Sequence, residues 1–120
     1  MSKQISFTKY EHQIVPEFRE KINKAESPED VRASFSYTVR ELFDNIFKDR
    51  ITVTDDDIIL VPDKDQQYMF SDQLKSRSDF TSVWENSDLP RLVQDLASSA
   101  VRRYKHLEKH PERTESKIRM

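Results

Sequence analysis

The sequence of 120 residues contains no glycine, where a chain of this length would ordinarily have about eight. This absence excludes the glycine-rich phosphate loops of nucleoside triphosphatases and of dinucleotide-binding proteins. It also excludes the common calcium loop and the glycine-flanked serine elbow of one hydrolase class. Asparagine is the next residue to tolerate a left-handed backbone, so we expect such positions near helix ends at Asn23, Asn45 and Asn86.

Cysteine is absent as well, so the chain has no disulfide, no thiol nucleophile and no thiolate metal ligand. Long hydrophobic runs are also missing. The longest is Ile58 to Val61, far below the roughly 20 residues of a membrane helix. The first residues lack the apolar segment of a signal peptide. We therefore expect a cytoplasmic protein that does not contact a membrane.

The remaining composition is that of a folded domain with a highly charged surface. Leu, Ile, Val and Phe make up 30 of the 120 residues, above the roughly 20% associated with disorder. The net charge of −2 conceals an asymmetry, because residues 41–95 carry a net −7 and residues 96–120 a net +4. An acidic body with a basic end can mark a polyanion-binding segment.

Two helices are predicted in the first half of the chain. Thr8 and Glu11 have the spacing of a capping box, with Thr8 as the N-cap residue. Pro16 conflicts with one continuous helix, so this helix either kinks there or starts afresh with Pro16 at its first position. The second helix is predicted over 28–48, because Ser27 can cap it, Pro28 suits its first turn, and an apolar stripe follows at steps of three and four residues.

A small antiparallel meander of two or three strands is predicted next. Residues 51–54 alternate and are β-branched, which is typical of a strand. Residues 58–61 are apolar throughout, which predicts a central strand covered on both faces. Residues 67–70 are a candidate third strand. Acidic and proline-containing turns separate the three segments.

Helical spacing returns in the last third of the chain. Phe80, Val83 and Trp84 predict a short helix for which Asp79 could act as the cap, and an apolar stripe from residue 89 predicts a long helix that Pro111 ends. We predict an α+β fold in which the helices pack on one face of the sheet. Residues 1–110 should form a single domain, and 111–120 a disordered basic tail.

Acidic and histidine clusters suggest metal sites, but a simpler interpretation exists for each. Five acids, Asp55, Asp56, Asp57, Asp63 and Asp65, fall in two turns that a strand would hold about 13 Å apart. Acidic turns are ordinary turn chemistry. His106 and His110 have the spacing of half a zinc site, but histidine near a helix C-terminus also complements the helix dipole. We expect no metal, no cofactor and no catalytic residue.

Two other sets of residues are candidates for binding. The basic end of the chain could contact a polyanion such as nucleic acid, or could simply complement the dipole of its own helix. Its residues are Arg102, Arg103, Lys105, Lys109 and Arg113. The aromatic residues should mostly fill the core, but a surplus could line an interface or a ligand pocket. The candidates for that role are Phe35, Phe43, Phe47 and Trp84.

These observations favour a non-catalytic protein-interaction or regulatory domain that acts on a protein partner or as a homodimer. Two alternatives stay open. One is a nucleic-acid-associated protein that uses the basic C-terminal helix and tail. The other is a small-molecule-binding domain with an aromatic pocket. No motif in the sequence decides among the three.

Overall fold

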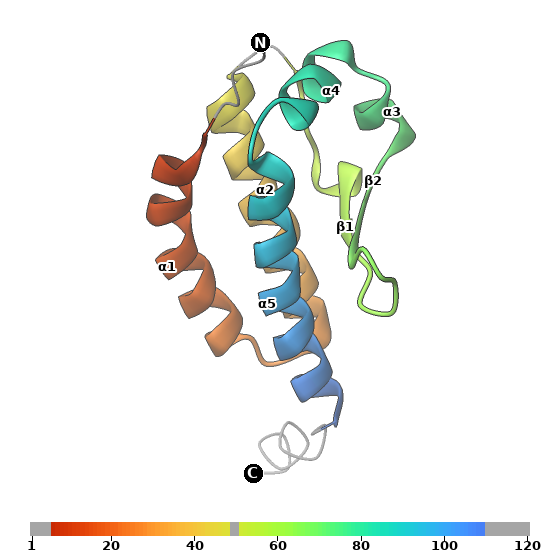
Figure 1. The fold of residues 1–120 in the computed structure, drawn as a ribbon. Coiled ribbons are helices and arrows are strands. Elements are labelled where there is room, and N and C mark those ends of the chain that lie inside the picture. The colour runs from red at the N-terminus through yellow and green to blue at the C-terminus, as the bar shows by residue number, and fades with distance from the viewer. Residues whose placement is uncertain (1–5, 49–50, 110–120) are drawn as a thin grey trace.

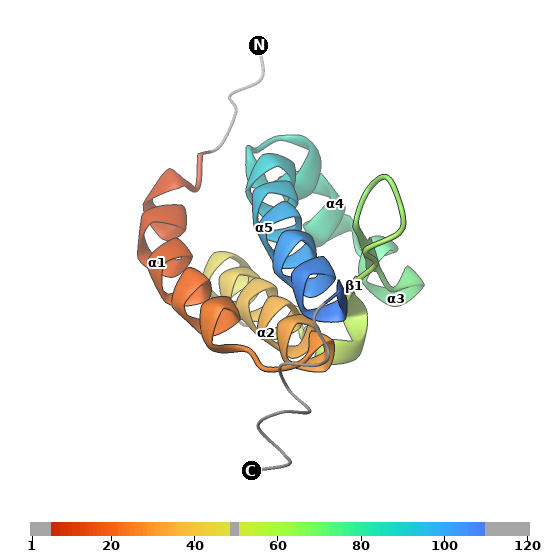
Figure 2. The same ribbon diagram turned by 90° about the horizontal axis from the view of Figure 1, so that it is seen from below.

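The computed structural model describes residues 6–48 and 51–109, and this part of the chain is an α+β fold. Its elements in order are α1 (Thr8–Lys24), α2 (Pro28–Phe47), the short 3-10 helix η1 (Asp55–Asp57), β1 (Ile58–Leu60), β2 (Tyr68–Phe70), α3 (Asp72–Lys75), α4 (Ser78–Glu85) and α5 (Leu89–Lys109). The three long helices α1, α2 and α5 lie side by side (Figures 1 and 2). The β1–β2 hairpin, α3 and α4 cover the side of α2 and α5 that faces away from α1. The predicted fold class is confirmed.

Helix α1 runs without interruption through Pro16, which settles the question that the sequence left open. Both Pro16 and His12, whose carbonyl loses its usual amide partner, lie on the exposed side of the helix, where water can replace that hydrogen bond. The predicted capping box is wrong. Phe7 occupies the N-cap position without a side-chain cap, and the Thr8 hydroxyl donates instead to Asp88, 3.5 Å away at the start of α5.

Helix α2 confirms the prediction for residues 28–48 to within one residue. The Ser27 hydroxyl accepts a hydrogen bond of 3.2 Å from the amide of Asp30, and Pro28 lies in the first turn. The apolar stripe is buried along its whole length, at Val31, Phe35, Val39, Leu42, Phe43 and Phe47. Each such side chain contributes about 1.5–3 kcal/mol when fully buried, so α2 is the central element of the fold.

The described sheet has two strands, the smaller of the two numbers predicted, and the candidate strand over 67–70 is β2. β1 pairs antiparallel with β2 in the register Ile58–Phe70, Ile59–Met69 and Leu60–Tyr68. Residues 52–54 belong to no strand, because the Asp57 carboxylate takes up the amide and hydroxyl of Thr54 at 2.9 and 3.2 Å. A side chain that binds the backbone in this way competes with a strand ladder. Ile51 and Val53 are nevertheless buried, as their alternation predicted.

The segment after β2 is more helical than the sequence indicated. Ser71 caps the single turn of α3, because its hydroxyl accepts from the amide of Leu74 at 3.1 Å. α4 begins at Ser78 after Arg77, so Asp79 does not cap it. α5 follows from Leu89 to Lys109, and the predicted end at Pro111 and the predicted tail over 111–120 lie outside the described residues. No helix in the described ranges has the length and apolarity needed to cross a membrane.

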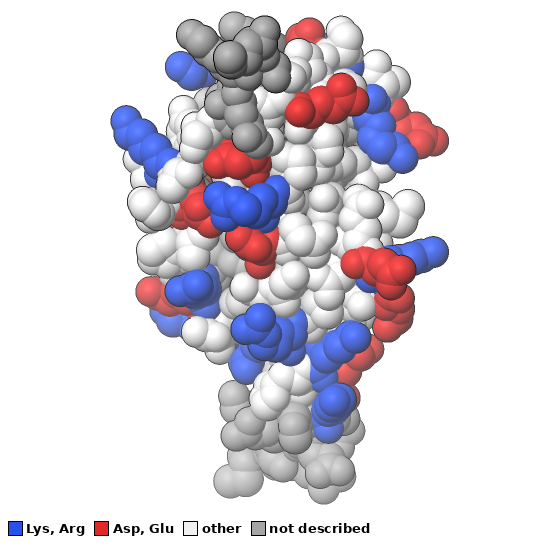
Figure 3. Space-filling view, in the orientation of Figure 1, with Lys and Arg blue, Asp and Glu red and all other residues white. Residues whose placement is uncertain are grey.

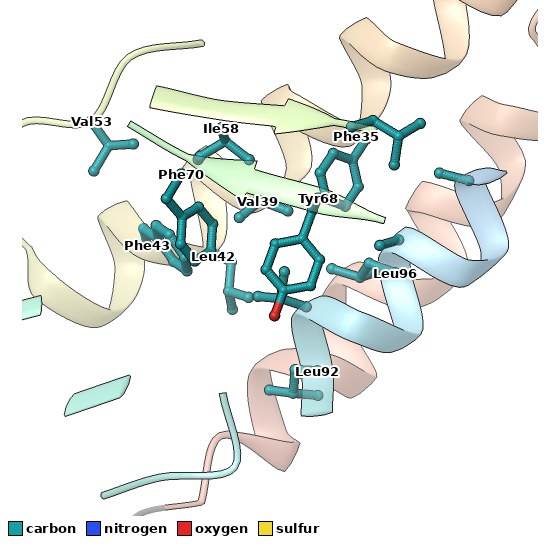
Figure 4. Close-up of a cluster of buried hydrophobic side chains, with 14 of the residues drawn as sticks. Phe35, Val39, Leu42, Phe43, Val53, Ile58, Tyr68, Phe70, Leu92 and Leu96 are labelled. Carbon is teal, nitrogen blue, oxygen red and sulfur yellow. The ribbon is translucent and has the colours of Figure 1, made fainter. Parts of the chain in front are cut away.

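The core lies between α2, α5 and the inner face of the hairpin (Figure 4). Phe43 contacts Phe70 and Phe80 with ring centroids 5.8 and 5.4 Å apart, and Trp84 lies 5.1 Å from Phe70. These edge-to-face contacts are the arrangement that aromatic quadrupoles favour. They join α2, β2 and α4 into one packed cluster.

The left-handed backbone positions are not at the asparagines, and that prediction is wrong. Among the described residues, Lys48 at the end of α2 has φ of 46° and Gln67 before β2 has φ of 66°. Asn86, by contrast, has φ of −112°. Without glycine, the chain places two side chains with a Cβ atom where a Cβ atom is unfavourable.

Candidate functional site

The basic residues at the C-terminal end of α5 do not form one continuous patch. Arg103 is a structural residue. Its Nε donates to the carbonyl of Ile22 at 2.9 Å, and its Nη2 donates to the carbonyls of Asn23 and Ala25, both at 3.1 Å. Arg103 therefore complements the dipole at the C-terminal end of α1. The sequence had suggested only that the basic residues complement the dipole of their own helix.

The other basic residues of this end lie on the surface. Arg102, Lys105 and Lys109 are exposed, and Arg113 lies outside the described residues. Lys and Arg side chains gather over the lower end of α5 in Figure 3. Of the exposed three, Arg102 lines a groove between α1 and α5 together with Arg19 and His106.

The aromatic candidates are mainly core residues. Phe35, Phe43 and Phe47 are buried, so none of them faces a partner at the surface of the described chain. Trp84 is partly exposed and packs on Phe70 and Phe80. The unusual number of rings is thus explained by the compact cluster that joins the hairpin to α2 and α4.

The first acidic turn serves the local structure through Asp57. Asp57 accepts hydrogen bonds from Thr54 and, at 2.6 Å, from the Ser71 hydroxyl, which ties the start of β1 to the end of β2. Burial alone would raise the pKa of Asp57, but these hydrogen bonds outweigh burial and lower its pKa below the ordinary value. Among the described residues, no three His, Asp or Glu side chains are placed to hold a metal ion.

The outer face of the hairpin carries an apolar pair that the fold leaves uncovered. Ile59 and Met69 lie directly opposite each other in the register, and each is 49% exposed. Their neighbours along the two strands, Ile58, Leu60, Tyr68 and Phe70, are buried on the inner face. Large apolar side chains that adjoin on a surface often mark a contact site.

The free edge of β1 adjoins this apolar pair. The Ser71 amide donates to the Asp57 carbonyl at 2.9 Å, and the Val61 amide donates to the Gln67 carbonyl at 2.8 Å. Since hydrogen-bonded pairs alternate along an antiparallel ladder, Ile59 also points its backbone groups at β2. The backbone groups of Ile58 and Leu60 therefore point the other way, to an edge that has no second strand in the described part of the chain.

A shallow open groove of about 270 Å³ runs between this edge and α2. The strand β1 forms one wall, and Arg32, Ala33 and Ser36 of α2 form the other, with Asp56 also lining the groove. The Ser36 hydroxyl donates to the Ile58 carbonyl at 2.7 Å, which still leaves that oxygen a second lone pair. Arg32, Ala33 and Asp56 are exposed, whereas Ile58 and Leu60 are 0% and 1% exposed, so packing against α2 covers the backbone groups of this edge.

Arg32 and Asp56 lie at opposite ends of the groove. In Figure 4, Phe43 and Ile58 lie toward one end of the core and Phe35 toward the other, so α2 runs antiparallel to β1. Arg32 precedes Phe35 on α2, while Asp56 precedes Ile58. The groove therefore has a cationic end and an anionic end.

Comparisons with known proteins do not identify a relative. No protein-family model matches the sequence, and no curated protein and no solved structure matches it. The geometry of the chain itself is therefore the basis for a functional proposal.

The exposed hairpin face was missed at the sequence level, although its signal was present. The run 58–61 predicted a strand covered on both faces, whereas β1 is covered on one. The same sequence predicted that all helices pack on one face of the sheet. An entirely apolar strand combined with helices on a single face implies a leftover apolar face, which is where Ile59 lies.

Proposed function

We propose that this chain is a non-catalytic interaction domain that forms a homodimer by pairing β1 with β1 of a second copy. The observation that carries the proposal is the uncovered Ile59–Met69 pair beside an unpaired strand edge. A two-stranded hairpin is marginal as a sheet, and open edges are natural templates for another strand. Edge pairing would join two hairpins into one four-stranded sheet, and it requires the α2 side chains that cover Ile58 and Leu60 to move aside.

The backbone pattern of β1 suits an antiparallel pairing with itself. Ile58 and Leu60 direct their amide and carbonyl groups outward, so Ile58 would pair with the partner's Leu60 and Leu60 with the partner's Ile58. Ile59 would then face the partner's Ile59 at a position without hydrogen bonds, where cross-strand side chains lie closest. The two Met69 side chains would flank this contact, and the four residues would form one apolar strip.

The charges of the groove support a partner of the same kind. A two-fold axis through Ile59 superposes the cationic end of one groove on the anionic end of the other, so each Arg32 would approach an Asp56 of the other copy. An isologous interface requires such self-complementarity. Oppositely charged ends also fix the register of the pairing.

Sedimentation equilibrium of the full chain tests the proposal. The wild type should be dimeric, and Ile59→Glu should be monomeric, because it would place two carboxylates against each other at the centre of the interface. Ile59 is half exposed, so the substituted chain should keep its helical circular dichroism. Gln13→Glu, which adds the same charge on the exposed side of α1, is the matched control and should remain dimeric.

Charge reversal makes the test specific for this register. Arg32→Asp or Asp56→Arg alone should weaken the dimer at least about tenfold, and the double variant should restore it. The Arg32 guanidinium also lies 5.3 Å from the ring of Tyr104, so stability should be checked for each variant. A monomeric wild type, or a dimer that Ile59→Glu leaves intact, would contradict the proposal. If the wild type is a monomer that binds an extended peptide along β1, the partner of this edge is another protein and not a second copy of this chain.

A further inference from the structure

A second hollow in the surface lies between the last turns of α1 and the C-terminal half of α5. It is an open groove of about 360 Å³, at the small end of the range for ligand sites. Arg19 and Asn23 line it from α1, and Ser99, Arg102, Arg103 and His106 line it from α5. None of the described residues that line it is acidic. This groove shares no residue with the hairpin edge.

The cations of this groove are held in different ways. Arg103 is fixed by its three hydrogen bonds to the carbonyls at the end of α1, so its position does not depend on a ligand. Arg19 and Arg102 are exposed and approach the groove from two different helices. The packing of α1 on α5 therefore gathers guanidinium groups that are about eighty residues apart in the sequence.

We propose that this groove binds the phosphate or diphosphate group of a small phosphorylated molecule. Guanidinium groups bind phosphate oxygens through paired, charge-assisted hydrogen bonds. The Asn23 amide and the Ser99 hydroxyl, which line the same groove, supply neutral donors for further oxygens. The small volume suits a compact anion.

The surroundings argue against nucleic acid as the ligand. A nucleic-acid surface neutralises a row of phosphates and often stacks bases on exposed rings. Here the cations meet in one groove, Tyr104 lies partly buried under Arg32, and residues 41–95 carry a net charge of −7. A small phosphorylated molecule needs only this one cluster of cations, whereas a long polyanion needs a row of cations.

Isothermal titration of the full chain with pyrophosphate at low ionic strength tests the inference. The wild type should bind saturably, and Arg19→Gln and Arg102→Gln should each weaken binding about tenfold, the effect of losing one charge-assisted contact. Lys105→Gln removes a neighbouring exposed charge of α5 that does not line the groove, so it should change affinity less than about twofold.

Two further ligands, a nucleoside diphosphate and a single-stranded oligonucleotide, show which class of phosphorylated molecule the groove binds. A nucleoside diphosphate that competes with pyrophosphate shows that the groove accepts the phosphates of a larger small molecule. The inference is overturned if the wild type does not bind pyrophosphate saturably, or if Lys105→Gln weakens binding as much as Arg102→Gln. Tighter, arginine-dependent binding of a single-stranded oligonucleotide than of pyrophosphate would also overturn it. Ile59 does not line the groove between α1 and α5, so Ile59→Glu tests dimerisation without changing the phosphate site. The two proposals can therefore be contradicted independently.

Discussion

The helical side of the molecule and the hairpin side differ in how the backbone groups at the ends and edges of their elements find partners. On the helical side, α1 is held at its N-terminal end by Asp88, the residue before α5, and at its C-terminal end by Arg103 of α5. Asp88 accepts the Phe7 amide at 2.9 Å at one end, and Arg103 donates to three carbonyls at the other. Arg91 adds an ion pair of 3.6 Å with Glu11, whose charge raises the pKa of Arg91.

The hairpin side has strands of three residues, and the carboxylate of Asp57 ties its two strands together. Its outer apolar pair faces solvent, and the β1 edge has no second strand among the described residues. Left-handed residues lie before and within the hairpin, at Lys48 and Gln67. A side chain from a distant part of the sequence can bind the unpaired backbone groups at a helix end. It cannot replace the row of backbone groups that a missing strand would supply. The hairpin is therefore the side that a second chain can complete.

The largest effect should follow from removing the link at the end of α1. Arg103→Met keeps the aliphatic part of the side chain but loses hydrogen bonds to three carbonyls. We expect the free energy of unfolding to fall by about 2 kcal/mol, since bonds from a charged donor are stronger than neutral ones, but one of the three is exposed and the other two are only partly buried. Urea unfolding measures it. Arg102→Met, one residue away and exposed, is the control and should change stability by less than about 0.5 kcal/mol. An equal loss in both variants would show that Arg103 contributes only charge.

The anchor of the hairpin should show a smaller, pH-dependent effect. Asp57→Asn should lower stability by about 1.5 kcal/mol at pH 7, because the amide cannot replace the carboxylate toward all three donors. Folding lowers the pKa of Asp57 below 3.8, so the charged form stabilises the fold fully above that pH. Its contribution is lost as the pH falls through the lowered pKa. The difference in urea midpoint between wild type and variant should therefore shrink below about pH 4.

The control for this pH profile is Asp63→Asn, at an exposed position in the turn between the strands. This variant should track the wild type at every pH. A difference between wild type and Asp57→Asn that persists unchanged at low pH would mean that the hydrogen bonds do not depend on the charge of Asp57.

The helices were predictable because their signals are local. Ser27 and Pro28 mark the start of α2, and its buried stripe follows the spacing seen in the sequence. The start of α1 was predicted to within one residue but for the wrong reason. Its stabilising contact comes from Asp88, eighty residues away, which no local pattern can reveal.

The hairpin and the two grooves were less predictable for the same reason. Residues 51–54 have strand composition, but the Asp57 carboxylate takes the backbone groups that a ladder needs. The basic stripe of α5 was visible in the sequence, whereas Arg19, which lines the same groove from α1, was not singled out. A groove between two helices depends on their packing, which the sequence of either helix does not encode alone.

The smallest effect concerns the absent glycine. Lys48 has φ of 46° and ψ of −149°, a conformation that glycine adopts far more readily than a residue with a Cβ atom. Lys48→Gly should therefore raise the free energy of unfolding by about 1 kcal/mol, measured by urea unfolding, even though glycine makes the unfolded chain more flexible. Asn45→Gly, within α2, is the matched control and should lower stability by about 0.3 kcal/mol, because asparagine is itself a poor helix former. Equal losses of stability in both variants would mean that the Lys48 side chain stabilises the end of α2 by more free energy than its backbone strain costs. A gain at residue 48 alone would locate the effect of the missing glycine at the end of α2.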